Sequence, residues 1–364
     1  MVDPINLKPL KIGSLEFPVP IVQGGMGVAI STAPLVSAVS NEGGLGVIAS
    51  VGLGEFEPDI YENYGVANAR ALRKEIQRTR TMTSRPIGVN IMSVLSDYDT
   101  LAGVCNDERV EAIISGAGLP LKLPQYVDNG YTKLIPLISN GRVARILLKR
   151  WDHEYKRTAD AVVVEGPDSG GHQGFSLEEI HQSDNKTLER LFIDTKENLI
   201  SFEQKYGKKI PVIVAGGIYS GEDIARYLNL GADGVQIGSR FILTEECEAD
   251  PRLKQAHLDA QVDDITLTLS PIGLQARVIK NEFYERIKGG EKFDFRCPYK
   301  CLSVCKAGDA NFCIAQALLA AKRGDMKNGL VLCSTTTSKN DKIYSVKGLM
   351  SELVNDASQH YGGK

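Results

Sequence analysis

Two glycine-bearing turns, each at the end of an apolar run, have the residue types and the spacing of a ligand-binding site. A Gly-Gly pair follows the run Pro211–Ala215, and Ser239 follows the run Val235–Gly238. Glycine lets backbone N–H groups approach a ligand without a Cβ in the way, and free N–H groups at a helix start bind anions. We therefore expect Gly217, Gly238 and Ser239 to hold a phosphate; the alternative is that these glycines only form tight turns.

A third polar loop follows the run Ala161–Glu165 and reads GPDSGGHQG, with His172 between glycines. An imidazole exchanges protons near neutral pH, so His172 is the candidate general base. A structural role is the alternative for any single histidine. The sequence contains no G-x-S-x-G elbow, which argues against a serine nucleophile. The other histidines are interpreted as surface-helix or tail residues: His153, His181, His257 and His360.

Glycines and an amide side chain also follow the earlier strand-like runs. Gly24, Gly25 and Met26 come after the first run, where a flat ligand can lie against the backbone. Asn90 offers a donor and an acceptor, which suits the edge of a heterocycle. Its alternative role is that of a satisfied loop cap. Ser115 and Ser139 are the further hydroxyls at strand ends.

Eight strand-like runs alternate with helical patterns, and this alternation predicts a parallel sheet with right-handed crossovers. Eight such strands favour a closed TIM (β/α)8 barrel, whose chemistry sits at the carboxyl ends of the strands. The segment Gly44–Ala49 matches G-x-G-x-x-A, but its glycines lead into a strand instead of a helix, so a Rossmann domain is rejected. The runs are Pro20–Gln23, Leu45–Ser50, Ile87–Met92, Ala112–Ser115, Lys133–Ser139, Ala161–Glu165, Pro211–Ala215 and Val235–Gly238.

The regular alternation stops after the eighth strand. We expect residues 1–245 and 335–364 to form the barrel, and residues 246–334 to form a smaller helical lid that supplies substrate walls. The stretch Ser345–Val354 has the pattern of an amphipathic helix that packs back on the barrel.

Four cysteines cluster in this lid, in the sequence RCPYKCLSVCKAGDANFC. The C-x3-C-x3-C-x7-C spacing differs from both the usual zinc pair and the ferredoxin run. Four close thiolates can still hold zinc or an iron–sulfur cluster, but the spacing favours free thiols, so no metal is expected. The cysteines are Cys297, Cys301, Cys305 and Cys313.

Composition excludes several classes of protein. The chain has 364 residues, 43% of them hydrophobic, which is enough for a large core. A net charge of −3 gives no electrostatic basis for nucleic-acid binding. No apolar run is long enough to span a membrane, and the N-terminus has no apolar signal core. Together with seven cysteines and no sign of secretion, this predicts a cytoplasmic protein; a homodimer is left open.

Five motifs together resemble the nitronate monooxygenase family, formerly called 2-nitropropane dioxygenases, which is related to FMN-dependent enoyl-ACP reductases and NAD(P)H:quinone reductases. The motifs are VQGGMG, IGVNIM, VVVEGPDSGGHQG, PVIVAGGI and GVQIGSRF, and they cover residues 15–245. The resemblance implies a barrel that binds FMN. It also implies that His172 acts as base on nitroalkanes, or lies near the acceptor in the reductases.

The resemblance places the isoalloxazine ring by Gly24, Gly25, Met26 and Asn90, and the phosphate by Gly217, Gly238 and Ser239. The chain has Gly24-Gly25 where many members have Ala-Pro, and Ser239 where threonine is common. Its cysteine segment is absent from the best-known members. The remaining positions expected to bind the cofactor are Glu165, Gly171, Ala215, Gly216 and Gln236.

Several functions are therefore predicted as alternatives. The first is an FMN-dependent oxidation of alkyl nitronates by O2, and the second an NAD(P)H-dependent reduction of an enoyl thioester or a quinone. Two readings from other classes are a flavin-free barrel that binds a sugar phosphate and a metal-dependent interaction module built on the cysteines. The sequence does not identify the physiological substrate.

Overall fold

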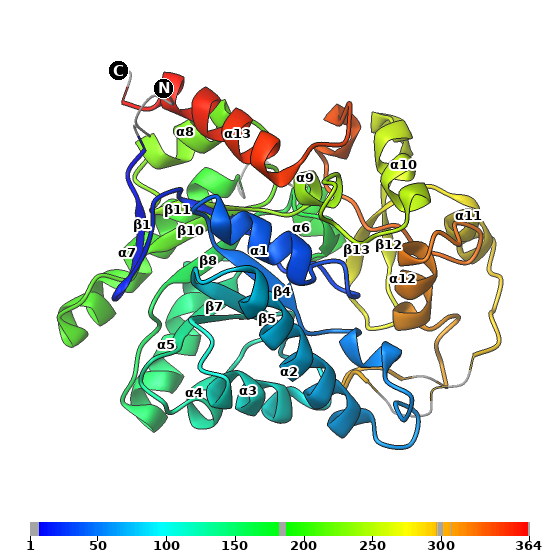
Figure 1. The fold of residues 1–364 in the computed structure, drawn as a ribbon, viewed down its shortest axis with the longest axis horizontal. Coiled ribbons are helices and arrows are strands. Elements are labelled where there is room, and N and C mark those ends of the chain that lie inside the picture. Colours follow the sequence, from blue (N-terminus) through cyan, green and yellow to red (C-terminus); the bar gives the residue numbers. More distant parts are fainter. Residues whose placement is uncertain (1–6, 182–186, 296, 298–300, 307, 363–364) are drawn as a thin grey trace.

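Eight parallel strands form a closed barrel in the computed structural model, which describes residues 7–181, 187–295, 297, 301–306 and 308–362 (Figure 1). The strand order is β3-β11-β10-β8-β7-β6-β5-β4, and a parallel bridge between Val22 and Leu45 joins the two end strands. The TIM-like barrel predicted from the sequence is confirmed, and each of its strands overlaps one of the eight predicted runs. The strands are β3 (Ile21–Gln23), β4 (Gly46–Ala49), β5 (Ile87–Met92), β6 (Ala112–Gly116), β7 (Lys133–Ile138), β8 (Val162–Glu165), β10 (Val212–Ala215) and β11 (Gly234–Ile237).

The interior of the barrel is filled by aliphatic side chains from alternate strand positions. Val47, Ile114 and Val163 are fully or almost fully buried there. A hairpin that the sequence analysis did not identify, β1 (Leu10–Ile12) with β2 (Leu15–Phe17), packs its apolar residues into the same cluster. The short hairpin therefore closes the end of the barrel away from the strands' carboxyl ends.

Amphipathic helices surround the strands and carry recognisable start signals. Ser220 and Asp223 form a capping box at the start of α8. The arginines of α2 form ion pairs with nearby carboxylates, such as Arg70 with Glu57 and Arg78 with Glu248. The helices are α1 (Ala33–Asn41), α2 (Tyr64–Met82), α3 (Tyr98–Asp107), α4 (Leu123–Tyr126), α5 (Gly141–Tyr155), α6 (Leu177–His181), α7 (Leu188–Tyr206), α8 (Gly221–Asn229) and α9 (Ser239–Ile242).

The C-terminal helix α13 (Val346–His360) packs against α8, as expected from its amphipathic pattern (Figure 1). A Cβ at Gly221 would lie 2.3 Å from the backbone nitrogen of Ala357, so the two helices approach closely at this glycine. The helix is longer than predicted, continuing to His360.

The insertion after the barrel forms the right-hand part of the molecule in Figure 1 and contains strands as well as helices. A purely helical lid was expected; instead, β12 and β13 form a hairpin that pairs with β9 (Gly171–His172). The Thr and Leu residues of β12 alternate, which is typical of a strand, but this pattern was not used in the prediction. The domain boundaries remain a prediction. The elements are α10 (Pro251–Asp259), β12 (Ile265–Leu269), β13 (Gln275–Ile279), α11 (Glu282–Lys288) and α12 (Ile314–Lys322), with short 3-10 helices at Leu53–Phe56, Val262–Asp264 and Thr337–Lys339.

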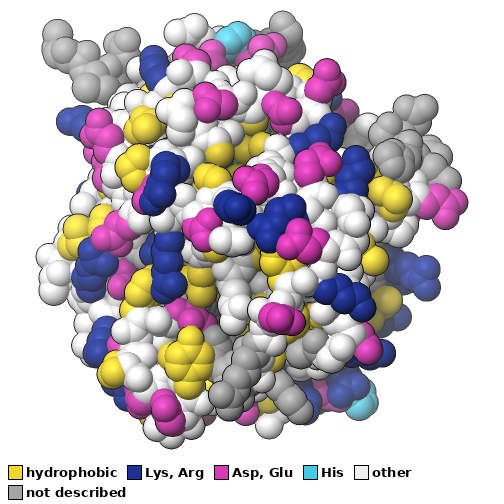
Figure 2. Space-filling model, turned by 90° about the vertical axis from the view of Figure 1, so that its right-hand side faces the viewer, with side chains coloured by type: hydrophobic (Ala, Val, Ile, Leu, Met, Phe, Trp, Pro, Cys, Tyr) yellow, Lys and Arg dark blue, Asp and Glu magenta, His cyan; other side chains and the backbone are white. Residues whose placement is uncertain are grey.

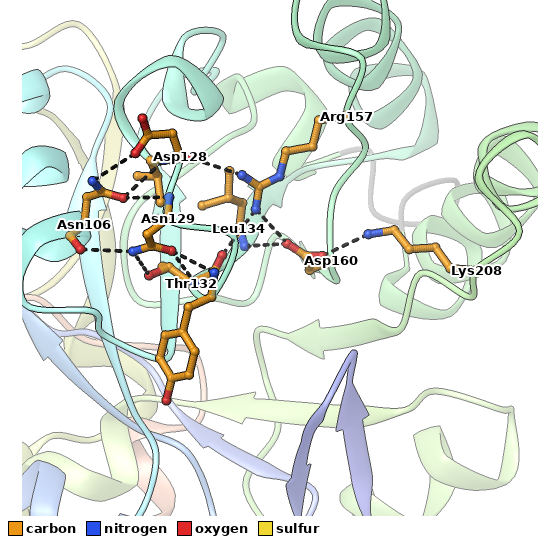
Figure 3. Close-up of polar contacts among 10 residues, drawn as sticks. Asn106, Asp128, Asn129, Thr132, Leu134, Arg157, Asp160 and Lys208 are labelled. Atoms are coloured by element: carbon orange, nitrogen blue, oxygen red, sulfur yellow. Dashed lines mark hydrogen bonds and ion pairs between the residues drawn. The ribbon is translucent and has the colours of Figure 1, made fainter.

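A polar network joins the loops that lead into β7 and β8 (Figure 3). Arg157 donates to the carbonyl of Thr132 at 3.2 Å and to Asp160 at 3.3 Å, and Lys208 lies 2.9 Å from the other Asp160 oxygen. Burial alone would raise the pKa of Asp160, but the Leu134 N–H and the charges of Lys208 and Arg157 outweigh it and lower the pKa. The network therefore fixes these loops around an ionised carboxylate.

Acidic and basic side chains are intermixed on the surface. Figure 2 shows the insertion side of the molecule, where acidic and basic side chains are interspersed among polar and apolar ones. In the described part of the chain, no helix has the length and apolar character needed to cross a bilayer.

Candidate active site

A cavity of about 310 Å³ opens at the carboxyl ends of the barrel strands, between the barrel loops and the insertion. All the site residues predicted from the sequence line this one cavity, although they come from six separate strand ends and loops. They are Gly24, Gly25, Met26, Asn90, Glu165, Gly171, His172, Ala215, Gly216, Gly217, Gln236, Gly238 and Ser239. The fold thus brings the predicted residues together, as a barrel active site requires.

The loop after β3 is held in place by a buried glutamine. The side chain of Gln23 accepts from the N–H of Val47 at 3.0 Å and donates to Ser31 Oγ at 2.8 Å and to the Gly24 carbonyl. A Cβ at Gly25 would lie only 2.3 Å from Cβ of Asn90, so the backbone must pass here without a side chain. The glycine therefore sets how closely the first loop approaches β5.

Two amide side chains in the cavity wall lack protein partners. Gln236 on β11 has a buried Oε1 without a hydrogen bond, and the Asn90 side chain makes none to the described residues. Buried amides in native proteins are almost always satisfied. Their free donors and acceptors are therefore available to a polar heterocycle in the cavity.

The glycine turns after β10 and β11 leave room for a ligand in different ways. Gly216 and Gly217 have φ of +96° and +80°, which disfavours any other residue. At Gly217 a Cβ would also lie 2.9 Å from Cβ of Asp168. At Gly238 the atoms nearest to an added Cβ belong to Met26, at 3.7 and 3.8 Å, so only the cavity would be filled. Gly238 therefore borders a space that a side chain would occupy.

His172 lies on β9, where it pairs with Ala276 of the insertion. Its Nε2 is 2.9 Å from Oγ of Ser270, and burial lowers the pKa of the imidazole to about 4. The ring is therefore neutral at physiological pH, which is the protonation state that a general base needs.

Glu165 ends β8 in the same cavity, level with Ala215 of β10. Burial raises the pKa of its carboxyl group to about 7. Near neutral pH this side chain exists in both forms, so it can donate a hydrogen bond as well as accept one.

A second cavity histidine was missed. His257 was interpreted as a surface residue, but it is 1% exposed, lines the cavity from α10 and has an Nδ1 atom without a hydrogen bond. Burial lowers its pKa to about 4. The available signal was its i, i+4 spacing from Leu253, which also lines the cavity. The side chain of His181, assigned to the same surface class, lies outside the described residues.

The motifs give no signal for the other residues of the cavity wall. Two hydroxyls expected at strand ends, those of Ser115 and Ser139, lie outside the cavity. Ser115 Oγ donates to the carbonyl of Ile91 and contacts the hydroxyl of Tyr98, both at 2.9 Å, so it has a structural role. Helix α12 instead supplies an apolar wall with Ile314, Ala315, Leu318 and Ala321.

The family model that matches this chain is Nitronate monooxygenase, over residues 8–102 and 93–356. The chain belongs to this family. It is an oxidoreductase of the flavin-dependent type, and the unpaired amides and open glycine turns of its cavity fit a flavin.

Individual relatives differ in their activities. A (3aS,4S,5R,7aS)-5-hydroxy-7a-methyl-1-oxo-octahydro-1H-indene-4-carboxyl-CoA dehydrogenase of Mycobacterium tuberculosis is 29% identical over 75% of this chain, which spans 66% of the dehydrogenase, just under two thirds. A probable nitronate monooxygenase of Staphylococcus haemolyticus is 28% identical over 76% of this chain and 79% of its own length.

Solved structures support the same fold. FabK from Thermotoga maritima is 30% identical, with a TM-score of 0.72 and 94% of both chains covered. Nitroalkane oxidase from Streptomyces ansochromogenes has a TM-score of 0.72 at 24% identity, and the match covers 94% of this chain and 97% of the oxidase chain. At this identity the likeness is evidence for the fold alone.

Proposed function

We propose that this protein is an FMN-dependent oxidoreductase that oxidises alkyl nitronates with O2. The observation that carries the proposal is a buried, neutral His172 in a largely apolar cavity that also contains unpaired amide groups. Bound FMN would supply the two-electron chemistry, accepting electrons from the substrate and passing them to O2. The family and the probable nitronate monooxygenases among its relatives support this choice.

The chain's own residues would bind the two ends of FMN in different ways. The free amides of Asn90 and Gln236 match the N–H and C=O groups of the ring edge. Gly217, Gly238 and Ser239 leave backbone N–H groups open to the phosphate. Because burial raises the pKa of Glu165 to about 7, its carboxyl group can bind hydroxyls of the cofactor without adding a full negative charge.

His172 would move the substrate proton. A neutral nitroalkane must lose a carbon-bound proton before oxidation, and a neutral imidazole nitrogen accepts it. Ser270 lies 2.9 Å from Nε2 and fixes the orientation of the ring. Apolar residues of α12, such as Ile314 and Leu318, line the cavity and would help to exclude water from it.

A second candidate is an NAD(P)H-dependent reductase that acts on an enoyl thioester or a quinone. The observation that favours it is the likeness to FabK, which at 30% identity and 94% coverage extends through the insertion as well as the barrel. In this reading His172 lies beside the electron acceptor. The apolar α12 wall suits an acyl chain as well as it suits a nitronate.

A steady-state comparison separates the two candidates. The purified holoprotein is given propyl nitronate with O2, and separately NADH or NADPH with an enoyl thioester or a quinone. Oxygen consumption with nitronate, and no NAD(P)H oxidation, is the expected result. NAD(P)H-dependent turnover without nitronate activity would replace the proposal with the reductase, and protein that binds no flavin would contradict both.

A further inference from the structure

Arg240 is a buried cation that the proposed chemistry leaves without a role. It follows Ser239 directly, in α9, and is only 4% exposed. The described residues that line the cavity include Ser239 but no arginine or lysine. A guanidinium is costly to bury unless its donors are satisfied. The partners of Arg240 therefore indicate which parts of the fold it holds in place.

The guanidinium of Arg240 joins the two turns that the proposed function assigns to the FMN phosphate. Its Nη1 donates to the carbonyl of Tyr219 at 2.9 Å, and Tyr219 lies two residues after Gly217, in the turn after β10. Its Nη2 donates to Oε1 of Glu352 on α13 at 2.8 Å. The rigid fork of a guanidinium holds both acceptors in one geometry. Arg240 therefore connects the turn after β11 with the turn after β10 and with α13.

Two tyrosine rings contact the same guanidinium. Cζ of Arg240 lies 4.3 Å from the ring centroid of Tyr219 and 5.1 Å from that of Tyr344. Both distances are typical of cation–π contacts, which are strongest where water is excluded. The carbonyl of Tyr344 accepts from the N–H of Glu245 at 2.8 Å, just after α9. A third segment, residues 333–345, which we call the C-terminal arm, thus packs against Arg240.

The C-terminal arm also lies beside the turn after β10. The Tyr219 hydroxyl donates to the carbonyl of Lys339 at 2.5 Å, and the N–H of Thr335 donates to the carbonyl of Asp168 at 3.4 Å. Two hydroxyl-bearing residues of the arm line the cavity, Ser334 and Thr336. Arg240 is therefore placed where three segments that form the cavity wall meet.

We propose that Arg240 is a positioning residue for the flavin phosphate, an inference that rests on the FMN binding proposed above. Backbone N–H groups bind a phosphate well only when they converge on it, so the spacing of the two turns decides the strength of the site. Arg240 fixes this spacing without lining the cavity, because it donates from one turn to the other. Its loss weakens the phosphate contribution to binding and leaves the contacts of the ring end with Asn90 and Gln236 in place.

The test measures how tightly the full chain, stripped of flavin, binds FMN and riboflavin, which lacks the phosphate. Fluorescence titration gives both dissociation constants, and their ratio isolates the contribution of the phosphate. In Arg240→Met the preference for FMN should fall by about tenfold, as affinity does when outer partners that orient metal-binding groups are removed. The affinity for riboflavin should stay at its wild-type value.

Arg226→Met on α8 is the matched control. Arg226 also contacts a tyrosine ring and a carboxylate, those of Tyr227 and Glu189, but its side chain is exposed and bonds to α7 instead of a turn. This variant should keep the wild-type preference for FMN. Arg240→Lys retains the charge but lacks the fork, so it should lose part of the preference. It replaces Arg240→Met if that variant does not fold.

The possible outcomes separate this role from the FMN site itself. A wild-type preference for FMN that persists in the folded Arg240 variant would overturn the role of Arg240 and leave the FMN site standing. Equal losses of FMN and riboflavin affinity would also overturn it, because a general effect on the fold weakens both. Equal affinity of the wild-type chain for the two flavins would overturn the phosphate site and, with it, the role of Arg240.

Discussion

Burial sets the protonation state of two histidines and one carboxylic acid that line the cavity. It lowers the pKa of His172 and of His257 to about 4 and raises the pKa of Glu165 to about 7. All three shifts favour the neutral form, because the wall around these groups is mostly apolar and, among the described residues that line it, includes no lysine or arginine. The site is thus prepared for proton transfer between neutral partners, and this property shapes the predictions for single residues.

Replacing His172 with asparagine should separate proton abstraction from electron transfer. Activity on neutral nitroalkanes should fall by about 10²–10⁴-fold, because the general base is lost. Activity on preformed nitronates, which have already lost that proton, should fall much less. Steady-state rates on both substrates, with flavin content measured in parallel, check this. His153→Asn on α5 is the surface control, and equal losses on both substrates would assign His172 to binding instead.

His257 should make the protein less stable in acid. Its pKa is about 4 when folded and 6.5 when unfolded, so below pH 6.5 the unfolded chain binds the extra proton. The unfolding free energy should therefore fall by roughly 3 kcal/mol as pH drops from 6.5 to 4. His257→Gln should lack this component. Urea unfolding at pH 7.0 and 4.5 measures it, and a wild-type-minus-variant difference that does not change with pH would contradict the prediction.

At the scale of elements, patterns in the sequence predicted the barrel strands but not the sheet of the insertion. Each barrel strand is a short apolar run ended by glycine or a polar residue, and these local signals determine a parallel strand. The pairing of β13 with β9 joins residues far apart in the chain, such as Ala276 and His172, and no local pattern records it. The spacing of His257 from Leu253 indicated a shared helix face, but only the folded insertion turns that face of α10 toward the cavity.

The network around Asp160 yields a prediction about how the loops before β7 and β8 are held. Asp160→Asn removes the charge that faces Arg157 and Lys208 and alters the acceptor of the Leu134 N–H. The unfolding free energy should fall by about 1–3 kcal/mol, because the buried Leu134 N–H and the half-buried Arg157 lose a charged partner. Glu189→Gln, which breaks the exposed pair with Arg226, is the control and should change it by less than about 1 kcal/mol. Equal effects in chemical denaturation would contradict this role.

At the scale of the whole molecule, barrel and insertion share one cavity. Gly24, Gly217 and Gly238 come from the barrel, while His257 and Leu318 come from the insertion, and all of them line the same space. A ligand that fills this space contacts both parts and binds only the folded chain. Its binding free energy therefore adds to the stability of both parts together.

The cofactor should accordingly stabilise the entire chain, and its phosphate should account for part of that effect. FMN at about 100 times its Kd should raise the unfolding free energy by about 2.7 kcal/mol and move a single thermal transition upward. Riboflavin, which lacks the phosphate, should raise it less at the same concentration. Gly238→Val should erase the difference between the two ligands, because its side chain would occupy space beside Met26, the one residue beyond the chain neighbours with atoms within 4 Å of an added Cβ. Gly103→Ala on α3, where a Cβ meets nothing within 4 Å, is the matched control and should keep the difference.

Differential scanning fluorimetry with each flavin measures these shifts. Equal stabilisation of the wild-type chain by FMN and riboflavin would place the phosphate outside the turns after β10 and β11, and stabilisation by FAD alone would reject a mononucleotide site.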